Sequence, residues 1–243
     1  MNSELASDVT NSIQNSAFRI QNSPRRVLLT AGPTYEPIDP VRFIGNHSTG
    51  KMGYALAQEF ADAGFAVTLV SGPTSLSIEH PAVQVVRVQT AQEMYEAAAA
   101  VAQQADIWVF AAAVADYRPG TVATEKIKKR DDGSNETLVL ELVKNIDIAA
   151  TLGQTKRPEQ FSVGFALETQ DELRHAQDKL RRKNFDLVVL NSLRDAGAGF
   201  RHDTNKITLV DAHGATAFEL KPKAAVAHDI VSAIVARLQP HVA

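Results

Sequence analysis

The sequence contains no cysteine in its 243 residues, which excludes disulfide bridges, thiolate zinc sites, iron–sulfur clusters and a cysteine nucleophile. No apolar run approaches the roughly 18 residues that a membrane span needs, so we expect no membrane partner. The 25 Lys and Arg nearly balance the 28 Asp and Glu, which argues against the basic surface of a nucleic-acid-binding protein. The absence of cysteine fits the reducing cytoplasm.

Residues 1–24 are rich in Asn and Ser and poor in large apolar side chains, a composition typical of a flexible leader or linker remnant. They lack the charged start and the continuous apolar stretch of a signal peptide. The periodic patterns begin after them and continue to the C-terminus. We therefore expect a single domain over residues 25–243, a length that suits one α/β domain.

Short β-branched runs alternate with amphipathic helical patterns along this domain. Strands are predicted over 27–32, 66–72, 83–88, 106–114, 162–167 and 186–191, and helices over 50–64, 90–104, 168–184 and 223–238. This alternation predicts βαβ units and a Rossmann-like α/β fold, with a doubly wound, mostly parallel sheet. Residues 205–221 predict a C-terminal β-hairpin around a DAHG turn, and the charged, Gly-containing segment 115–145 predicts a long flap.

The loop over 32–53 is the most informative of those expected at the carboxyl ends of the strands, where open parallel sheets bind ligands. GNHSTGKM within it nearly matches a P-loop, but Met52 replaces the hydroxyl that would hold Mg²⁺. A G-x-G-x-x-G dinucleotide fingerprint is absent as well. Two interpretations stay open, namely an anion site at a helix N-terminus and an ordinary helix start capped by Ser48 or Thr49.

Several polar residues near this edge could contact a ligand. Asn46 has an amide suited to an acyl oxygen, and Arg42 has a planar cation suited to carboxylate or phosphate, although a turn-forming Asn and a surface ion pair are simpler explanations. Asp116 could bind a sugar hydroxyl, a base or Mg²⁺. Lys126 belongs to EKIKK, which is either a solvated charge run or a lid over a polyanion.

Lys179 and Lys183 lie four residues apart and therefore share one face of a predicted helix. That face either grips an oligophosphate or pairs with neighbouring carboxylates in solvent. The sequence contains no His-x-x-x-His pair, so a His-based metal site is not expected.

Six elements occur in a fixed order: TAGPTYEPIDPVRFIGNHSTGKMGYALA, LVSGPT, AAAVADYRP, EKIKK, LVKNIDI and VGFALET. This series closely resembles the bacterial, CTP-dependent type of phosphopantothenate–cysteine ligase, from about Val27 to the final helix. The resemblance implies a homodimeric cytoplasmic enzyme of coenzyme A biosynthesis with shared active sites. Such an enzyme uses CTP and Mg²⁺ to join 4′-phosphopantothenate and L-cysteine through an acyl-cytidylate, releasing pyrophosphate and CMP.

The resemblance also implies roles for single residues. Asn46 and Lys126 are implied to be catalytic, and the metal ligands are left unassigned. The phosphopantothenate contacts implied are Asn46, Ala112, Ala113 and, in the neighbouring subunit's site, Arg42. The nucleotide contacts implied are Phe110, Ala111, Ala112, Asp116, Lys126, Asn145, Ile146, Asp147, Ile148, Phe165, Lys179 and Lys183.

Two alternatives remain open. An NAD(P)-dependent oxidoreductase of similar fold predicts a fingerprint turn after VLLTAG and an acidic residue at the end of the second strand, where Ser71 stands instead. A non-catalytic nucleotide-binding partner protein predicts binding without turnover.

Overall fold

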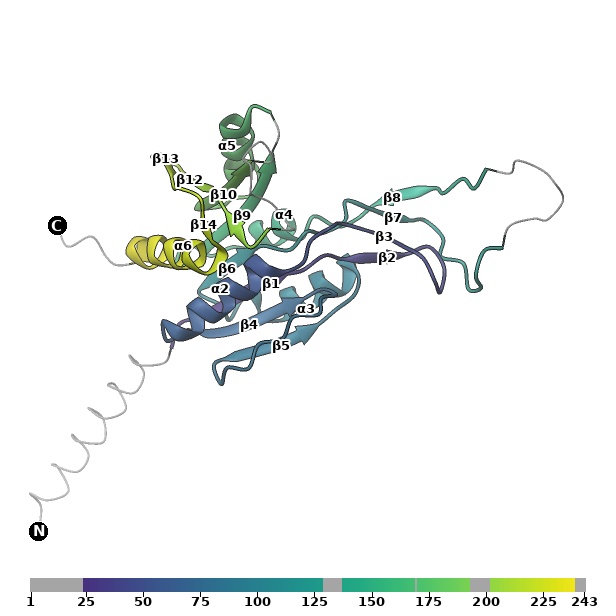
Figure 1. Cartoon of the computed structure of the whole chain (residues 1–243), viewed down its shortest axis with the longest axis horizontal. Coiled ribbons are helices and arrows are strands. Elements are labelled where there is room, and N and C mark those ends of the chain that lie inside the picture. Colours follow the sequence, from purple (N-terminus) through teal and green to yellow (C-terminus); the bar gives the residue numbers. More distant parts are fainter. Residues whose placement is uncertain (1–23, 129–136, 169, 193–201, 239–243) are drawn as a thin grey trace, which may run out of the picture.

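The computed structural model describes residues 24–128, 137–168, 170–192 and 202–238, so nearly all of the predicted leader lies outside it. Its main sheet consists of β1 (Arg26–Ala31), β4 (Ala66–Ser71), β5 (Val83–Arg87), β6 (Ile107–Phe110), β9 (Phe161–Glu168), β10 (Leu187–Ser192), β12 (Ile207–Asp211) and β13 (Gly214–Ala217). The strand order is β13-β12-β10-β9-β6-β1-β4-β5 (Figure 1). The strands from β10 to β5 pair in parallel, whereas β12 and β13 form an antiparallel hairpin on the β10 edge. This confirms the predicted doubly wound, mostly parallel sheet and its C-terminal hairpin.

Helices cover both faces of the sheet. The helices are α2 (Lys51–Asp62), α3 (Ala91–Ala102), α4 (Ile148–Gly153), α5 (Glu172–Arg182) and α6 (Lys223–Leu238). On one face, Phe60 of α2 and Ile230 of α6 pack with Leu29 of β1. On the other face, Met94 of α3 packs in a second core with Leu28, because successive strand residues point to opposite sides. The molecule is therefore a three-layer α/β/α domain.

Local sequence signals explain the main elements. Five of the six residues of β1 are buried, as expected of a central parallel strand covered on both faces. The helix predicted over 90–104 is present as α3, and a capping box begins it: Thr90 Oγ1 accepts from the Glu93 amide, and the Glu93 carboxylate accepts from the Thr90 amide. The end of the predicted strand 106–114 is wrong, because β6 stops at Phe110. Beyond it, the Ala111 amide donates to Thr30 O of β1 and the Ala113 amide donates to Gly32 O in the loop after β1.

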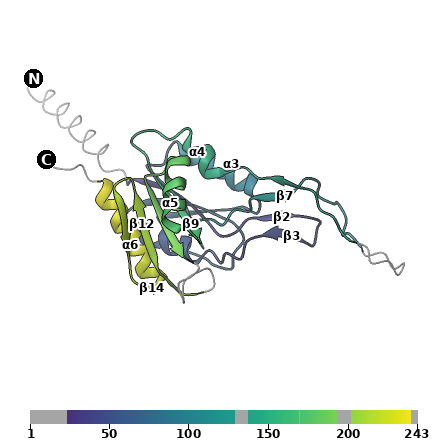
Figure 2. The same cartoon turned by 90° about the horizontal axis from the view of Figure 1, so that it is seen from above.

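Two antiparallel ribbons project from the body of the sheet (Figures 1 and 2). One pairs β2 (Tyr35–Pro37) with β3 (Phe43–Gly45), and the other pairs β7 (Tyr117–Pro119) with β8 (Leu142–Lys144). We call residues 35–45, 117–128 and 137–144 the arm. The predicted flap over 115–145 corresponds to the second ribbon and the chain beyond it, and residues 129–136 lie outside the described part. The first ribbon was expected to be loop. A further short pair, β11 (Thr204–Asn205) and β14 (Lys221–Pro222), precedes α6.

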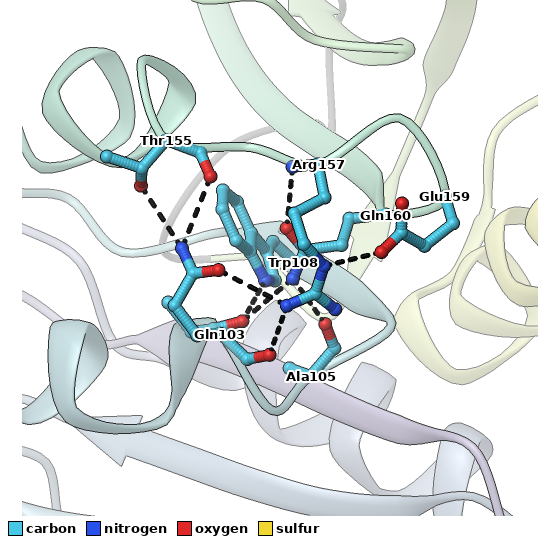
Figure 3. Close-up of polar contacts among 8 residues, drawn as sticks. Gln103, Ala105, Trp108, Thr155, Arg157, Glu159 and Gln160 are labelled. Atoms are coloured by element: carbon cyan, nitrogen blue, oxygen red, sulfur yellow. Dashed lines mark hydrogen bonds and ion pairs between the residues drawn. The ribbon is translucent and has the colours of Figure 1, made fainter.

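A polar network fixes the amino ends of β6 and β9 to the C-terminus of α3 (Figure 3). Gln160 Nε2 donates to the carbonyls of Ala102 and Ala105, and Trp108 Nε1 also donates to Ala102 O, at 2.7–2.9 Å. Arg157 Nη1 donates to Gln103 O at 2.6 Å. The last carbonyls of a helix have no intrahelical partner, so these donors satisfy groups that would otherwise be costly to bury. Within the described residues no helix has the length and apolar character needed to cross a membrane.

Candidate active site

A cavity of about 460 Å³ opens at the carboxyl ends of the central parallel strands. Thr30, Phe110 and Asn191, at or near the ends of β1, β6 and β10, contribute to its lining, together with Gly164–Leu167 of β9. From β1 the chain winds outward to β4 and β5, whereas β6, β9 and β10 extend the sheet on the other side. The cavity therefore lies at the topological switch point, where open α/β sheets bind their ligands.

Most of the predicted site residues line this cavity. They are Asn46, Phe110, Ala111, Ala112, Ala113, Asp116, Asn145, Ile146, Asp147, Ile148, Phe165, Lys179 and Lys183. Arg42 and Lys126 are the exceptions, because both lie on the arm and neither belongs to the lining. The structure thus brings together segments that are more than a hundred residues apart in the sequence.

Asn46 is held against the loop that follows β6. Its Nδ2 donates to the carbonyls of Ala113 and Val114, both at 3.1 Å. The two amide hydrogens are therefore occupied by backbone, and Oδ1 is the atom left to accept a hydrogen bond from a ligand. The small side chains of Ala112 and Ala113 leave space beside it in the cavity wall.

The start of α2 forms one wall of the cavity. Gly50 is the N-cap residue, with a left-handed φ of 78°, and no side chain caps the helix. The alternative in which Ser48 or Thr49 caps α2 is therefore wrong, because Gly50 is the N-cap residue. Ser48 Oγ accepts from the amide of Gly50, which precedes the helix, at 3.3 Å. A Cβ at Gly53 would lie 2.4 Å from Ala31 Cβ, so glycine lets α2 pack directly on β1. Gly50, Lys51, Met52 and Gly53 line the cavity, so the first turn of α2 lies at its edge.

Sequence reasoning missed a basic corner beside this helix start, which we call the lysine corner: Lys51, Lys223, Asn191 and Asn205. Lys51 Nζ pairs with Asp203 Oδ1 at 2.5 Å, and Asn205 Nδ2 donates to Asn191 Oδ1 at 3.0 Å. Burial lowers the pKa of Lys223 below its usual value, and the positive charge of Lys51 lowers it further. Lys51 lies within the GNHSTGKM motif but was not predicted as a site residue, and no local pattern marks Asn205 or Lys223.

The opposite wall is aromatic and carries the two predicted helix lysines. Phe110 and Phe185 pack with ring centroids 5.8 Å apart. Lys179 Nζ donates to Phe165 O at 2.8 Å, and burial followed by the charge of Lys183 lowers its pKa. Lys183 Nζ lies 2.9 Å from the Asp147 carboxylate. Both lysines of this wall are thus engaged with protein groups.

Asp147 joins this wall to α4. Its Oδ1 accepts from the Ala150 amide at 3.1 Å, so it is the N-cap of the helix. Burial acts to raise the pKa of Asp147, but the hydrogen bonds from Lys183 and Ala150 outweigh burial and leave that pKa below its usual value. Asp147 therefore remains charged at neutral pH and fixes Lys183 at the cavity edge.

Arg42 and Lys126 occupy the arm. Arg42 forms an ion pair with the Asp39 carboxylate, and its Nη2 donates to Ile127 O at 2.8 Å. Lys126, one residue before Ile127, is exposed. Among the described residues no group of three or more His, Asp or Glu could hold a metal ion.

A three-layer α/β/α domain with a cavity at the switch point of a parallel sheet is a Rossmann-like ligand-binding domain. More specifically, this chain belongs to the family described as the DNA/pantothenate metabolism flavoprotein C-terminal domain, whose model matches residues 23–238. This confirms the family resemblance expected from the motifs.

Similar proteins agree with this assignment. The crystal structure of the C-terminal domain of the coenzyme A biosynthesis bifunctional protein CoaBC aligns with a TM-score of 0.74 and 40% identity, covering 88% of this chain and 95% of that one. A protein named cysteine/cysteine sulfinic acid decarboxylase, from an unknown prokaryotic organism, is 51% identical over 211 residues, covering 86% of this chain and 58% of that protein. CoaBC of Vibrio vulnificus strain YJ016 is 47% identical over 210 residues, which are 86% of this chain and 52% of that protein. The chain thus spans little more than half the length of these curated relatives.

Proposed function

We propose that this domain is a phosphopantothenate–cysteine ligase of coenzyme A biosynthesis. The observation that carries the proposal is the cavity at the switch point, which gathers Asn46, Ala111–Ala113, Asp116 and Asn145–Ile148 from separate motifs of the family series. The family match and the identity to CoaBC proteins support it. Its substrates are then 4′-phosphopantothenate, L-cysteine and CTP, which are small charged metabolites that fit the expected cytoplasmic location.

The aromatic wall suits the base of the nucleotide. Phe110, Phe165 and Phe185 offer flat apolar surfaces, and the Asn145–Ile148 backbone lies beside them in the lining. Because Lys179 holds the Phe165 carbonyl and Lys183 holds Asp147, these lysines shape the base site before they contact any phosphate. We propose that CTP binds with its cytosine on this wall.

The lysine corner then suits the phosphates. In the first half-reaction a carboxylate oxygen of phosphopantothenate attacks the α-phosphorus of CTP, and pyrophosphate leaves. This step brings several negative charges together, so fixed cations and helix amides lower its barrier. Lys51, Lys223 and the first turn of α2 supply these groups on the wall that faces away from the base site.

Asn46 suits the second half-reaction. The cysteine amine attacks the acyl carbon of the acyl-cytidylate, CMP leaves, and the amine loses a proton. Because its Nδ2 is held by the Ala113 and Val114 carbonyls, Asn46 Oδ1 can accept a hydrogen bond from the incoming amine and orient it. The amide-forming step would then depend on Asn46 more strongly than pyrophosphate release does.

Magnesium fits this cavity as a companion of the nucleotide. Mg²⁺ in nucleotide sites usually takes one or two carboxylates together with phosphate oxygens and waters. The Asp116 carboxylate is exposed at the cavity and suits that role. When bound, the ion neutralises charge on the triphosphate.

The arm suits dimerisation. Many of the exposed large apolar side chains lie on it: Val41, Phe43, Tyr117, Val122, Leu138, Val139 and Leu142. Such a cluster marks a protein interface, and Arg42 and Lys126 lie on the same arm outside their own cavity. We propose a homodimer in which each arm completes the partner's site. Mixing Asn46→Ala with Arg42→Ala subunits should then restore part of the activity, and a complete lack of rescue would argue against shared sites.

The oxidoreductase alternative finds no support at the end of β4. Ser71 is fully buried there and donates to the Gly72 carbonyl, so no carboxylate is present to hold a ribose.

Pyrophosphate release, measured with CTP, ATP, GTP and UTP and with or without phosphopantothenate and cysteine, tests the function. We expect release that requires phosphopantothenate, is fastest with CTP and does not require cysteine. The absence of release with every nucleotide would refute the ligase proposal.

A further inference from the structure

Asp39 is a fully buried carboxylate on the arm, in the turn between β2 and β3. Two of its donors come from its own turn, the amides of Val41 at 2.9 Å and Arg42 at 2.8 Å. The Arg42 guanidinium donates through Nε at 3.0 Å and through Nη2. A further donor is the Ile127 amide at 3.1 Å, from the segment that follows β7. This long-range contact goes beyond what a turn of the β2–β3 ribbon needs.

Asp39 and Arg42 together bind both polar groups of the Ile127 backbone. Asp39 accepts from the Ile127 amide, while Arg42 Nη2 donates to the Ile127 carbonyl at 2.8 Å. Close by, the Ala123 amide donates to Ile38 O at 2.9 Å. The residues 123–127 are therefore tied at both ends to the turn of the first ribbon.

The electrostatics favour a permanent contact. The Arg42 guanidinium lowers the pKa of Asp39 well below its usual range, against the effect of burial, so the carboxylate stays charged at physiological pH. A planar guanidinium can hold a carboxylate through two parallel donors and still reach a carbonyl, whereas a lysine ammonium lacks this fork.

Lys126 precedes Ile127 directly and is exposed. We infer that Asp39 and Arg42 form a latch that fixes residues 123–127 and thereby positions Lys126 for the nucleotide. Arg42 is then a positioning residue that acts through the Ile127 backbone. This inference rests on the proposed function, because only a ligase gives Lys126 a triphosphate to meet.

The latch lowers the entropy cost of presenting the lysine. Ordering a backbone costs conformational entropy, and a free segment of this length would have to be ordered each time substrate binds. In the latched chain that cost is met during folding, and Lys126 has only its side chain to order.

Hydrogen exchange tests the latch without any substrate. We expect the Ile127 amide to exchange about tenfold faster in Asp39→Asn and in Arg42→Lys than in the unaltered chain. Asp178→Asn is the matched control, because Asp178 also pairs with an arginine three residues later, on the surface of α5. Exchange at Ile127 that is unchanged in both arm variants overturns the latch. If the Asp39→Asn variant does not fold, the Arg42→Lys variant provides this test. The Arg42 side chain is 42% exposed, so a lysine there can be accommodated.

Turnover tests whether the latch acts through Lys126. Pyrophosphate release should fall in Arg42→Ala and in Lys126→Ala, and the double variant should be no slower than Lys126→Ala alone. A double variant that is at least tenfold slower than Lys126→Ala would show that Arg42 contacts substrate directly, which overturns the positioning role. If the ligase proposal itself fails, the unaltered protein shows no turnover. In that case the positioning role of Arg42 falls as well, whatever the hydrogen-exchange result at Ile127.

Discussion

Replacing Lys223 with methionine removes an ammonium group from the lysine corner but keeps a stem of similar length. Lys223 Nζ donates to His202 O at 2.5 Å, and Lys51 lies near enough for its charge to lower the Lys223 pKa. A hydrogen bond from a charged donor to phosphate contributes about 1.5–3 kcal/mol, which corresponds to a loss of about 10- to 150-fold in affinity. We therefore expect the Kd for CTP to rise within that range.

Stability should respond differently. Burial lowers the pKa of Lys223 in the folded state below its value in the unfolded chain. Between these two pKa values the unfolded state therefore binds more protons than the folded state, and stability rises with pH. Protonated Lys223 thus disfavours folding at neutral pH, and this penalty disappears as pH approaches the usual lysine value. Losing the bond to His202 acts in the opposite direction. We expect the Lys223→Met variant to stay within about 1 kcal/mol of the unaltered chain at neutral pH. Relative to that chain, it should lose stability as pH rises.

Titration calorimetry with CTP and thermal unfolding between pH 7 and 10 measure the two effects. Lys221→Met is the matched control, because Lys221 lies two residues away, pairs with Asp229 at 2.7 Å and does not line the cavity. Equal loss of CTP affinity in both variants, or no loss in Lys223→Met, would refute the phosphate-binding role of the lysine corner.

Three further substitutions test other parts of the site. Asn46→Ala should still release pyrophosphate while acyl-cytidylate accumulates, as seen by mass spectrometry of quenched reactions; normal formation of the ligated product would contradict its role toward the amine. Lys126→Ala should slow pyrophosphate release at least tenfold, and an unchanged rate would remove it from the catalytic residues. Gly164→Ala places a Cβ 2.1 Å from the Phe185 ring, so we expect about 1–3 kcal/mol of lost stability in denaturant unfolding and weaker CTP binding. A fully stable Gly164→Ala variant would mean that Phe185 moves freely.

The sequence predicted the parts of the fold that carry a strong local period. Buried apolar runs such as 27–32 marked central strands, and the amphipathic pattern over 90–104 marked the helix α3. The β2–β3 ribbon was missed because its strands have three residues each, too few for an alternating pattern, and prolines interrupt the segment. The helix α4 was missed for the same reason, since six residues hold less than two turns.

Some residues of the candidate site were also predictable from the sequence and others were not. Residues 45–53 and 110–116 form contiguous motifs, so their order along the chain led to them. Lys223 was not predicted, because it enters the cavity from the start of the last helix and only the fold brings it beside Lys51. The arm position of Lys126 likewise depends on contacts to Asp39 and Arg42 that have no sequence signature.

The network around Gln160 lies at the amino ends of β6 and β9, whereas the cavity opens at their carboxyl ends (Figure 3). The two edges of the sheet therefore have separate tasks, one anchoring the central strands and the other offering loops to ligands. Changes that reshape substrate preference at the cavity need not weaken the anchor, and tighter packing near Gln160 need not disturb the cavity. For engineering, this separation offers a place to add thermal tolerance without altering what the domain binds.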